Sequence, residues 1–480
     1  MLNTAKQIIK KINNFGFDAY IVGGAVRDFI MNREIRDVDI ATNAPVQILK
    51  DNFNFINDVS KNMNLGVYII EQNGFKFEIA NFRIDGISKD HRKPEEIIFS
   101  NSFKRDASRR DFTINAMGMD YRGNIIDFFD GKSDIEHNIL RTVGCSFDRF
   151  GEDFLRILRA IRFAAKYNLK FDRSTAEAIK MCEGCLNSLS PERIQCELEK
   201  MASEGGIVFA NAIQLMEELN ILKDILPEMD KLFHLQHSKK HHPEGLCRNN
   251  KCKFFQQYQK LEFEDLPKKC KKCKYSFNSV GKHIIESLKL CSSTDINQLF
   301  AVAFHDIGKS TTYKLREKHG VLTHTYYGHD IEAEEILNKI ADRLRWSNTM
   351  REITIFCAKN HMLFHKIGKE LKGFTLLSLM ENRNFKYLIE TSYCDDASRK
   401  EIFNLDEWNK KLEYVKQFEK IFEFSKKITG KRILDLTKIN PGPRIGKIIK
   451  AVKKYVANNK ITNEEILDKK IIEYVKMIKK

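Results

Sequence analysis

Long apolar runs are missing from this chain of 480 residues, and so is any internal repeat of fixed period. The longest strongly apolar runs, such as residues 299–304, fall far short of the roughly 20 residues that a membrane-spanning helix needs. Residues 1–12 carry lysine and no apolar core, which argues against a secretory signal. We therefore expect a cytoplasmic protein that does not use a membrane.

Proline is scarce, with 8 residues, and the 11 cysteines are an odd number in a long, lysine-rich chain. Such a cysteine content does not resemble a secreted disulfide framework, so free thiols and metal ligation are the better expectation. Acidic residues are also outnumbered, because 81 Lys+Arg against 65 Asp+Glu leave a net charge of +16. A basic excess of this size favours a polyanionic partner, nucleic acid before an anionic membrane.

Apolar residues (42%) and aromatic residues (10%) are abundant enough to build cores, which excludes wholesale disorder. At about 150 residues per domain, the length predicts about three domains. Residues 19–143 alternate short β-branched runs with helix-like stretches and Gly or Asn turns, which is typical of a small α/β domain. After residue 148 apolar residues recur at three- and four-residue spacing, which predicts amphipathic helices. Composition and proline positions place domain edges near residues 145, 232 and 400.

The α/β region contains a glycine turn and a pair of carboxylates. Gly23 and Gly24 follow a predicted strand and allow close backbone approach, and the helix after them can direct free N–H groups at a phosphate. Asp37 and Asp39 are two apart on another predicted strand, so both carboxylates point to one face. Such a pair can hold Mg²⁺, and Glu78 on a further strand could supply a third carboxylate. An isolated pair of this kind is more often two solvated strand-end charges, but the motifs that follow reverse that balance.

Seven motifs follow one another in order. They are GGAVRD at 23–28, RDVDIAT at 36–42, FEIANFR, RRDFTINAM at 109–117, the DGKSD stretch from 130 with Arg141, EDFLRILRAIRF from 152, and PERIQCELEKM from 191. Together they resemble the bacterial class II tRNA nucleotidyltransferases, the CCA-adding enzymes of the nucleotidyltransferase and poly(A) polymerase superfamily. The resemblance covers roughly residues 1–230.

The resemblance implies addition of C, C and A to the 3′ end of tRNA from CTP and ATP without a template, with Mg²⁺ at the site and release of pyrophosphate. By motif, Asp37 and Asp39 would bind the metal, and Glu78 would be a third catalytic carboxylate. Arg109, Arg110 and Asp111 would hold the phosphates and ribose of the incoming nucleotide. The full set of implied nucleotide-binding residues is Gly23, Gly24, Arg27, Asp28, Arg109, Arg110, Asp111, Asn115, Glu152, Asp153, Arg156, Arg159 and Arg162.

A base-reading role for Asp153 and Arg156 can also be argued from chemistry. Cytosine and adenine both present an exocyclic amino donor beside a ring-nitrogen acceptor, whereas uracil and guanine reverse this pattern. A carboxylate together with a guanidinium therefore selects C and A. The two residues are three apart on a predicted helix, hence neighbours on one face. Alone, the pair reads as a surface salt bridge. Arg159 and Arg162 continue the helix, as phosphate contacts or as solvated charges.

Histidines and aspartates downstream form a second ordered series. It resembles the HD phosphohydrolase domain that accompanies some bacterial CCA-adding enzymes, and metal ligands of this kind fit Ni²⁺, Co²⁺ or Mn²⁺. The implied ligands are His283, His305, Asp306, His329, His361 and Asp396. The resemblance implies hydrolysis of 2′,3′-cyclic or terminal phosphates on RNA ends. Four further histidines of this region are expected to be structural: His234, His237, His324 and His365.

Residues 246–278 form a Lys- and Cys-rich segment that interrupts the HD pattern. Cys247, Cys252, Cys270 and Cys273 form a C-x4-C and a C-x2-C pair, close to zinc-ribbon spacing. Four thiolates satisfy a structural tetrahedral Zn²⁺, so we expect a zinc site there. Its lysines would grip an RNA backbone, or the metal would only pin a surface loop.

The last fifty residues, 431–480, hold 14 Lys+Arg against 5 Asp+Glu, which predicts contact with an RNA backbone. The fold expected is thus a multidomain α/β plus all-α chain: a nucleotidyltransferase head (1–145), a helical neck with the base-binding motif (146–232), an HD domain (233–400) and a helical tRNA-binding tail (401–480). Two alternatives stay open. One is a poly(A) polymerase or a partial, A- or CC-adding relative, and the other is an RNA-binding HD phosphohydrolase with an inactive head.

Overall fold

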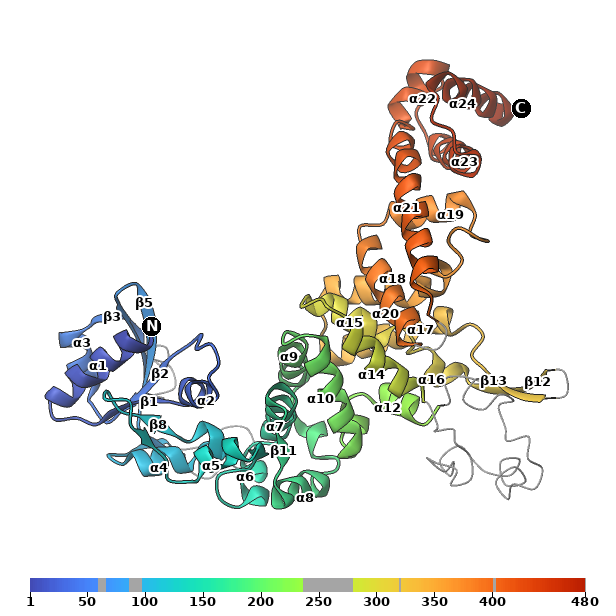
Figure 1. Cartoon of the computed structure of the whole chain (residues 1–480). Helices are drawn as coiled ribbons and strands as arrows, with labels where there is room; N and C mark the ends of the chain where they lie inside the picture. Colours follow the sequence, from blue (N-terminus) through green and yellow to red (C-terminus); the bar gives the residue numbers. More distant parts are fainter. Residues whose placement is uncertain (59–65, 86–96, 236–278, 319–320, 400–402, 480) are drawn as a thin grey trace. The chain divides into compact units, whose positions relative to one another are not determined.

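The computed structural model describes the chain except for residues 59–65, 86–96, 236–278, 319–320, 400–402 and 480 (Figure 1). It divides into two compact units. The first comprises Met1–Met201 and Asn211–Ile225, and the second comprises Ala202–Ala210 and Leu226–Lys480. Among the described helices, none is long and apolar enough to cross a membrane.

A seven-stranded sheet organises the head of the first unit, with strand order β3-β4-β5-β2-β1-β8-β9. β2 runs parallel to β5, and the other neighbouring strands are antiparallel. The strands are β1 (Ala19–Val22), β2 (Asp39–Thr42), β3 (Asn54–Asp58), β4 (Val67–Gln72), β5 (Phe75–Asn81), β8 (Gly118–Met119) and β9 (Ile125–Ile126). β6 (Arg83–Asp85) and β7 (Ile97–Phe99) form a separate ribbon. The helical elements are α1 (Leu2–Asn14), α2 (Gly24–Ile30), α3 (Val46–Asn52), α4 (Phe103–Ser108), η1 (Thr113–Asn115) and α5 (Gly131–Glu136).

The sheet is stabilised by the apolar face of α1 and by a cluster of aromatic side chains next to β1. α1 buries Ile8, Ile9 and Ile12, which recur at the spacing of one helix face, and it packs on β1. On the sheet, the rings of Tyr20 and Phe103 lie 4.8 Å apart, and Phe103 also contacts Phe82. Each fully buried aromatic ring contributes roughly 1.5–3 kcal/mol of transfer free energy, so this cluster anchors the sheet.

Helices dominate the rest of the first unit, as the change in periodicity after residue 148 predicts. Only one short pairing interrupts them among the described residues, where β10 (Ile139–Leu140) runs parallel to β11 (Lys170–Phe171). The helical elements are α6 (Ser146–Glu152), α7 (Leu155–Tyr167), α8 (Arg173–Met181), η2 (Cys185–Ser188), α9 (Pro191–Ala202), α10 (Gly206–Glu218) and α11 (Leu222–Ile225). The expected order of an α/β head followed by largely helical domains is confirmed, while the edges at 145, 232 and 400 stay predictions.

The second unit is helical apart from one described hairpin, β12 (Lys314–Lys318) with β13 (Val321–Thr325). The first group of helices is α12 (Pro227–Phe233), α14 (Val280–Leu290), α15 (Ile296–Phe304), α16 (Lys309–Thr312), α17 (His329–Leu344), α18 (Asn348–Phe364), α19 (Gly373–Met380) and α20 (Phe385–Ser398). The second group is α21 (Leu405–Ser425), α22 (Gly430–Thr437), α23 (Arg444–Asn459) and α24 (Glu464–Lys479). One apolar core joins both groups and includes Phe364, Trp408 and Val452.

Candidate active sites

The three head carboxylates meet at the centre of the sheet. Val38 and Ile40 are buried while Asp37 and Asp39 are exposed, so the predicted alternation is confirmed even though β2 begins only at Asp39. Glu78 stands opposite Asp39 in the parallel pairing of β2 with β5.

Loss of hydration raises the pKa of Asp39 to about 6, and the charges of Glu78 and Asp37 add to this effect while Arg110 opposes it. Carboxylates that repel one another in this way suit a divalent cation, so the residues present fit the predicted Mg²⁺. When bound, such a cation activates a hydroxyl nucleophile and neutralises the phosphates of a nucleotide.

The glycine turn lies beside these carboxylates, because Val22, the residue before it, pairs with Asp39. Gly23 has a φ of 68°, a left-handed conformation that favours glycine. A Cβ at this position would also lie 3.2 Å from a guanidinium nitrogen of Arg110, so the turn leaves room for that cation. The helix after the turn, α2, has seven residues and buries the Arg27 side chain.

Arginines around the turn are held by ion pairs. Arg27 contacts Asp28 at 2.9 Å and donates to Asn115 Oδ1 at 2.7 Å. Arg109 and Arg110 both pair with buried Asp106, at 2.9 and 3.2 Å. Their contacts with nucleotide phosphates remain a prediction. Arg110 lies close enough to Asp39 to oppose the rise in the pKa of that carboxylate.

Asp111 is tied to the neck instead of pointing into open space. It accepts hydrogen bonds from Arg159 at 2.6 and 2.9 Å and from Asn115 at 3.1 Å. Burial opposes its ionisation, but Arg159 and these hydrogen bonds hold the pKa of Asp111 below its ordinary value. Arg162 likewise pairs with buried Glu197 at 2.8 Å. Arg159 and Arg162 of α7 therefore form ion pairs within the protein and are not solvated charges.

The predicted side-by-side arrangement of Asp153 and Arg156 on one helix is wrong. α6 ends at Glu152 and α7 begins at Leu155, so Asp153 lies in extended backbone between the two helices. Its carboxylate accepts the Leu155 N–H at 3.0 Å and pairs with Arg193 of α9 at 2.8 Å. The physical reason is local, because Asp is better suited to accepting orphan N–H groups at a helix start than to a helix interior.

Arg156 forms its ion pair with Glu152 and also donates to the carbonyls of Arg149 and Arg109. The base-reading assignment of Glu152, Asp153 and Arg156 stays a prediction. Arg193, one of the residues of the PERIQCELEKM motif, is a further candidate that sequence reasoning missed. Its position in a motif at another part of the chain was the only available signal.

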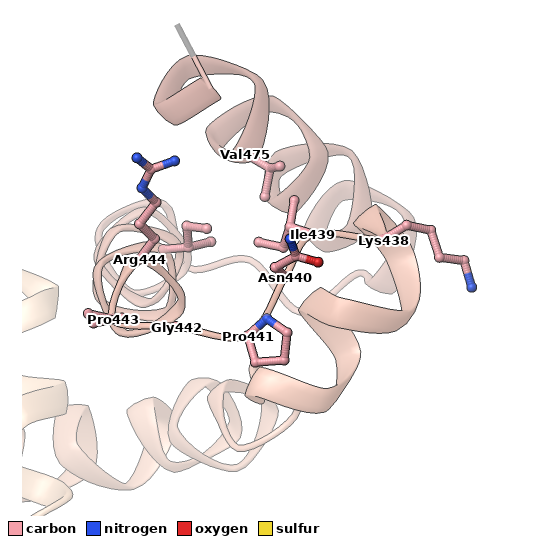
Figure 2. A pocket seen from close by; sticks show the side chains of 9 residues that line it. Lys438, Ile439, Asn440, Pro441, Gly442, Pro443, Arg444 and Val475 are labelled. Atoms are coloured by element: carbon pink, nitrogen blue, oxygen red, sulfur yellow. The ribbon is translucent and has the colours of Figure 1, made fainter.

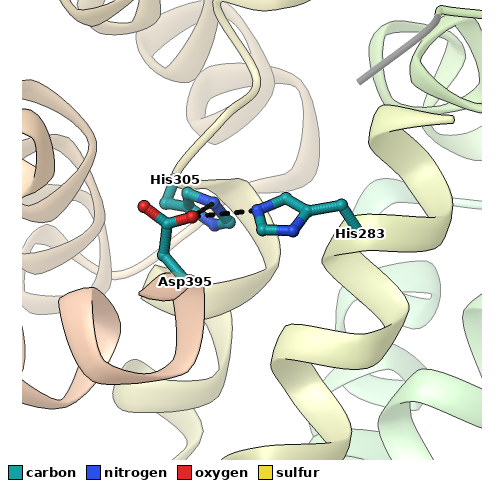
Figure 3. A group of neighbouring side chains, drawn as sticks. All are labelled: His283, His305 and Asp395. Atoms are coloured by element: carbon teal, nitrogen blue, oxygen red, sulfur yellow. Dashed lines mark ion pairs between the residues drawn. The ribbon is translucent and has the colours of Figure 1, made fainter. Parts of the chain in front are cut away.

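Histidines and aspartates in the second unit form a buried cluster. Two groups of three have ligand atoms within 4.8 Å of one another: His283, His305 and Asp395, and Asp306, His329 and His361. Figure 3 shows the first group, with α14, the end of α15 and α20 each contributing one side chain. The His283 Nε2 lies 3.0 Å from Asp395 Oδ1, and the His305 Nε2 lies 3.4 Å from Asp306 Oδ2. The Nε2 atoms of His329 and His361 both lie 3.6 Å from Asp306 Oδ1.

Backbone carbonyls orient three of these rings. The Nδ1 atoms of His305, His329 and His361 lie 2.8 Å from the carbonyls of Val302, Tyr326 and Ala358. Each ring therefore turns its Nε2 into the cluster, as the ligating histidines of metalloproteins do. Burial lowers the pKa of His361 to about 3, so that ring is neutral and its Nε2 can serve as a ligand. These features fit the predicted divalent-metal site.

Gly308 permits this assembly. A Cβ there would lie 1.9 Å from the carbonyl oxygen of His329, so only glycine lets the chain after Asp306 approach the start of α17. The sequence HDIGK thus places two predicted ligands, His305 and Asp306, directly before the glycine that allows His329 to approach them.

The structure places Asp395, not the predicted Asp396, in the cluster. Asp395 is 1% exposed and contacts His283, His305 and His365, while Asp396 pairs with His365 at 3.1 Å and Lys411 at 3.3 Å. Successive residues on a helix point about 100° apart, so only one of two adjacent aspartates can face the histidines. The sequence contained no signal that would choose between them.

His365, expected to be structural, holds the outer side of the cluster. Its Nε2 lies 3.1 Å from Asp395 and its Nδ1 lies 3.1 Å from Asp396. Burial works against its charge, but the two carboxylates raise the pKa of His365 to about 9. Arg399 also pairs with Asp395, and Lys309 with Asp306. These cations orient and neutralise the two carboxylates.

The tail has a pocket of about 470 Å³ between the loop at residues 438–444 and α24 (Figure 2). Lys438, Asn440 and Arg444 line it together with Pro441 and Pro443. Contact of the basic tail with tRNA remains a prediction. The four cysteines of the predicted zinc site, Cys247, Cys252, Cys270 and Cys273, lie outside the described residues.

Comparison with known families gives two matches in the first part of the chain. Residues 19–141 match the "Poly A polymerase head domain", and residues 168–233 match the "Probable RNA and SrmB- binding site of polymerase A". A CCA-adding enzyme of Lactococcus lactis subsp. cremoris is 36% identical over 49% of this chain and 61% of its own length. One of Staphylococcus haemolyticus is 41% identical over 42% of this chain and 50% of its own length. The matched region thus spans between half and three fifths of these relatives.

Solved structures show the same fold over nearly the whole chain. The Bacillus stearothermophilus CCA-adding enzyme in complex with CTP has a TM-score of 0.68 at 21% identity, covering 99% of this chain and 98% of its own. The Thermotoga maritima CCA-adding enzyme complexed with tRNA has a TM-score of 0.56 at 15% identity, covering 98% and 95%. The chain thus contains a poly(A) polymerase head domain and the adjoining RNA-binding region, and its sequence is similar to CCA-adding enzymes across both.

Proposed function

We propose that the chain adds C, C and A to the 3′ end of tRNA, using CTP and ATP and releasing pyrophosphate. The observation that carries this proposal is the set of Asp37, Asp39 and Glu78 beside the Gly23 turn, inside a region similar to CCA-adding enzymes. Relatives of the same fold are described in complex with CTP, with ATP and with tRNA, which supports the same substrates here. The net charge of +16 agrees with an RNA substrate.

The chain's own residues have separable roles in this reaction. The carboxylates hold Mg²⁺ and the terminal 3′-hydroxyl of the tRNA approaches from their exposed side. Arg109 and Arg110, fixed by Asp106, offer positive charge to the triphosphate. In the segment 152–156, Asp153 pairs with Arg193 and Arg156 donates to the carbonyl of Arg109. These contacts fix the polar groups that the segment presents to the base. Nucleotide selection then rests on protein side chains, since no template is present.

One experiment decides between this proposal and its rivals. The purified chain is incubated with tRNA lacking its tail, nucleotides are offered singly and together, and the products are sequenced. A full CCA end supports the proposal. Runs of A would indicate a poly(A) polymerase. Extension that stops after CC, or addition of A only to tRNA that already ends in CC, would indicate a partial-adding enzyme. No extension would favour an inactive head.

A second activity follows from the buried cluster of the second unit. We propose that His283, His305, Asp306, His329, His361 and Asp395 hold two divalent cations such as Ni²⁺, Co²⁺ or Mn²⁺ and that this centre hydrolyses phosphate esters on RNA ends. When bound, these ions polarise a phosphate and supply hydroxide at neutral pH. Hydrolysis of a 2′,3′-cyclic phosphate by the metal-loaded protein tests the proposal, and no hydrolysis with any of the three metals would contradict it.

A further inference from the structure

Two cysteines and a glutamate lie together in the second unit, apart from the groups assigned so far. Cys291 directly follows α14, whereas Glu390 and Cys394 are four residues apart on α20, which places their side chains on one face of that helix. α14 packs against α20, and this packing brings Cys291 to the other two residues. One atom of each, two sulfurs and a carboxylate oxygen, lies within 4.8 Å of the other two.

The spacing of these atoms is that of a small metal site. The Cys394 Sγ lies 4.0 Å from Glu390 Oε1. In a tetrahedral zinc site with bonds of about 2.3 Å to sulfur and about 2.0 Å to oxygen, ligand atoms stand roughly 3.5–3.8 Å apart. The three ligand atoms lie within 4.8 Å of one another, so rotamer adjustments of up to about 1 Å would bring them into the coordination sphere of one ion.

The three residues lie in a largely buried environment, in which a carboxylate and two thiolates are stabilised by a positive charge. Cys291 is 5% exposed and Cys394 is fully buried, and Glu390 is half-buried beside them. Within the described part of the chain, no lysine or arginine forms an ion pair with Glu390, and its carboxylate instead accepts a hydrogen bond from the Cys394 thiol.

We propose that Cys291, Cys394 and Glu390 form a further metal site for a thiophilic divalent cation, Zn²⁺ in the first place. Thiolate ligands select zinc over the hard cations of the carboxylate sites. Binding releases both thiol protons, so that two sulfur bonds and one carboxylate oxygen bond to the ion replace two S–H bonds. The fourth position is left for water or another small ligand.

The position of this site gives it a consequence for the His/Asp cluster. Cys291 ends the helix that carries His283, and Cys394 directly precedes Asp395. A metal held here links α14 to α20 and fixes the two helices that meet at the first group of the cluster. The proposal itself does not depend on phosphohydrolase activity, because the ion would bind whether or not that centre is catalytic.

Metal content and the spectrum of Co²⁺-substituted full-length protein test the site. Removing one cysteine, in Cys291→Ser or Cys394→Ser, should lower the zinc content by one equivalent per chain and reduce the cobalt–thiolate charge-transfer absorption. The His/Asp cluster contains no sulfur and cannot contribute to that absorption, while any contribution of the insert cysteines is equal in all variants. Cys357→Ser, which removes another fully buried thiol of this unit, is the matched control and should change neither quantity.

Glu390→Gln provides a variant that preserves both thiols and the shape of the side chain. It should retain the thiolate absorption but weaken zinc affinity by on the order of tenfold or more. Thermal unfolding of each variant verifies that it is folded. The proposal is overturned if Cys291→Ser and wild type hold equal zinc and show equal absorption, or if Cys291 and Cys394 are isolated as a disulfide from freshly purified, zinc-supplied protein.

Discussion

The head and the second unit each contain a cluster of carboxylates, but the two clusters differ in solvent exposure and in their charged neighbours. Asp37, Asp39 and Glu78 are exposed, the first two just before and at the start of β2 and the third within the neighbouring β5, and Arg109 and Arg110 are paired with Asp106. Asp306 and Asp395 are 1% exposed, and histidines, Arg399 and Lys309 surround them. The first site is open, so a large substrate must complete it. The second is assembled before any substrate arrives.

This difference implies different sensitivities. An exposed carboxylate can be replaced with little effect on folding, so its loss should appear almost purely in catalysis. A buried carboxylate supports both the metal and the packing, so its loss should appear in stability as well. Each of the following predictions tests one side of this contrast.

The largest effect is expected in the open site. Asp37→Asn or Asp39→Asn should lower nucleotide addition by on the order of 10³-fold or more, because charge that would hold Mg²⁺ is removed. Incorporation of CMP and AMP into tRNA lacking its tail measures this. Affinity for tRNA and the melting temperature should stay near wild type, and Asp51→Asn, another exposed carboxylate of the head, should have no effect. Near-normal addition by Asp37→Asn or Asp39→Asn would remove them from the metal site.

The buried cluster offers a comparison between adjacent residues. Asp395→Asn should abolish metal-dependent hydrolysis of cyclic phosphates and lower the melting temperature, because it leaves His283, His365 and Arg399 without their shared carboxylate. Asp396→Asn, which removes an outer contact, should reduce hydrolysis by about tenfold. Nucleotide addition should persist in both. The assignment of Asp395 fails if Asp396→Asn is the more damaging change.

A smaller effect is expected on nucleotide choice. Asp153→Ala or Arg156→Ala should relax selection against UTP and GTP by roughly 1–3 kcal/mol, since each change removes one discriminating hydrogen bond. Arg193→Ala should behave like Asp153→Ala if the ion pair at 2.8 Å is what holds that carboxylate in place. Competition between the four nucleotides measures the selection. Unchanged fidelity in all three variants would move base reading to other residues.

An effect on stability alone is expected for Glu197, a paired carboxylate of the neck. Burial works against ionisation of Glu197, but Arg162 and Lys200 hold its pKa below the ordinary value. Because the folded-state pKa is depressed, its stabilisation is complete above the unfolded pKa and is lost as pH falls through the folded pKa. Glu197→Gln should cost about 1.5–3 kcal/mol at pH 7 and less in acid. Denaturant unfolding at pH 7 and pH 4 tests this, and an equal loss at both pH values would contradict it.

The zinc site predicted from Cys247, Cys252, Cys270 and Cys273 can be tested without its structure. Protein purified without chelator should contain tightly held zinc, part of which is lost in the Cys270→Ser, Cys273→Ser double variant. That loss must be independent of the loss in Cys291→Ser, because different thiols are involved. Equal zinc in the double variant and in wild type would refute the site.

Several features of the molecule could be read from the sequence alone. The alternation around Asp37 and Asp39 requires only the period of a strand, and the change to helices after residue 148 requires only the period of a helix. The motif order indicated the poly(A) polymerase head, and the HDIGK motif predicted two metal ligands, His305 and Asp306, that the structure places in the buried cluster. Periodicity and motif order are properties of the sequence itself, so they can be recognised without knowing which residues are in contact.

Other features depended on contacts between distant segments, and only the tertiary structure decided them. The choice of Asp395 over Asp396 depends on the rotation of α20 against the helices that carry the histidines, and the ion pair of Asp153 with Arg193 depends on the approach of α9. The meeting of Cys291 with Cys394 requires α14 and α20 to pack side by side. Periodicity assigns a residue to a face of its own element, but it carries no information about which residue of another element that face will meet.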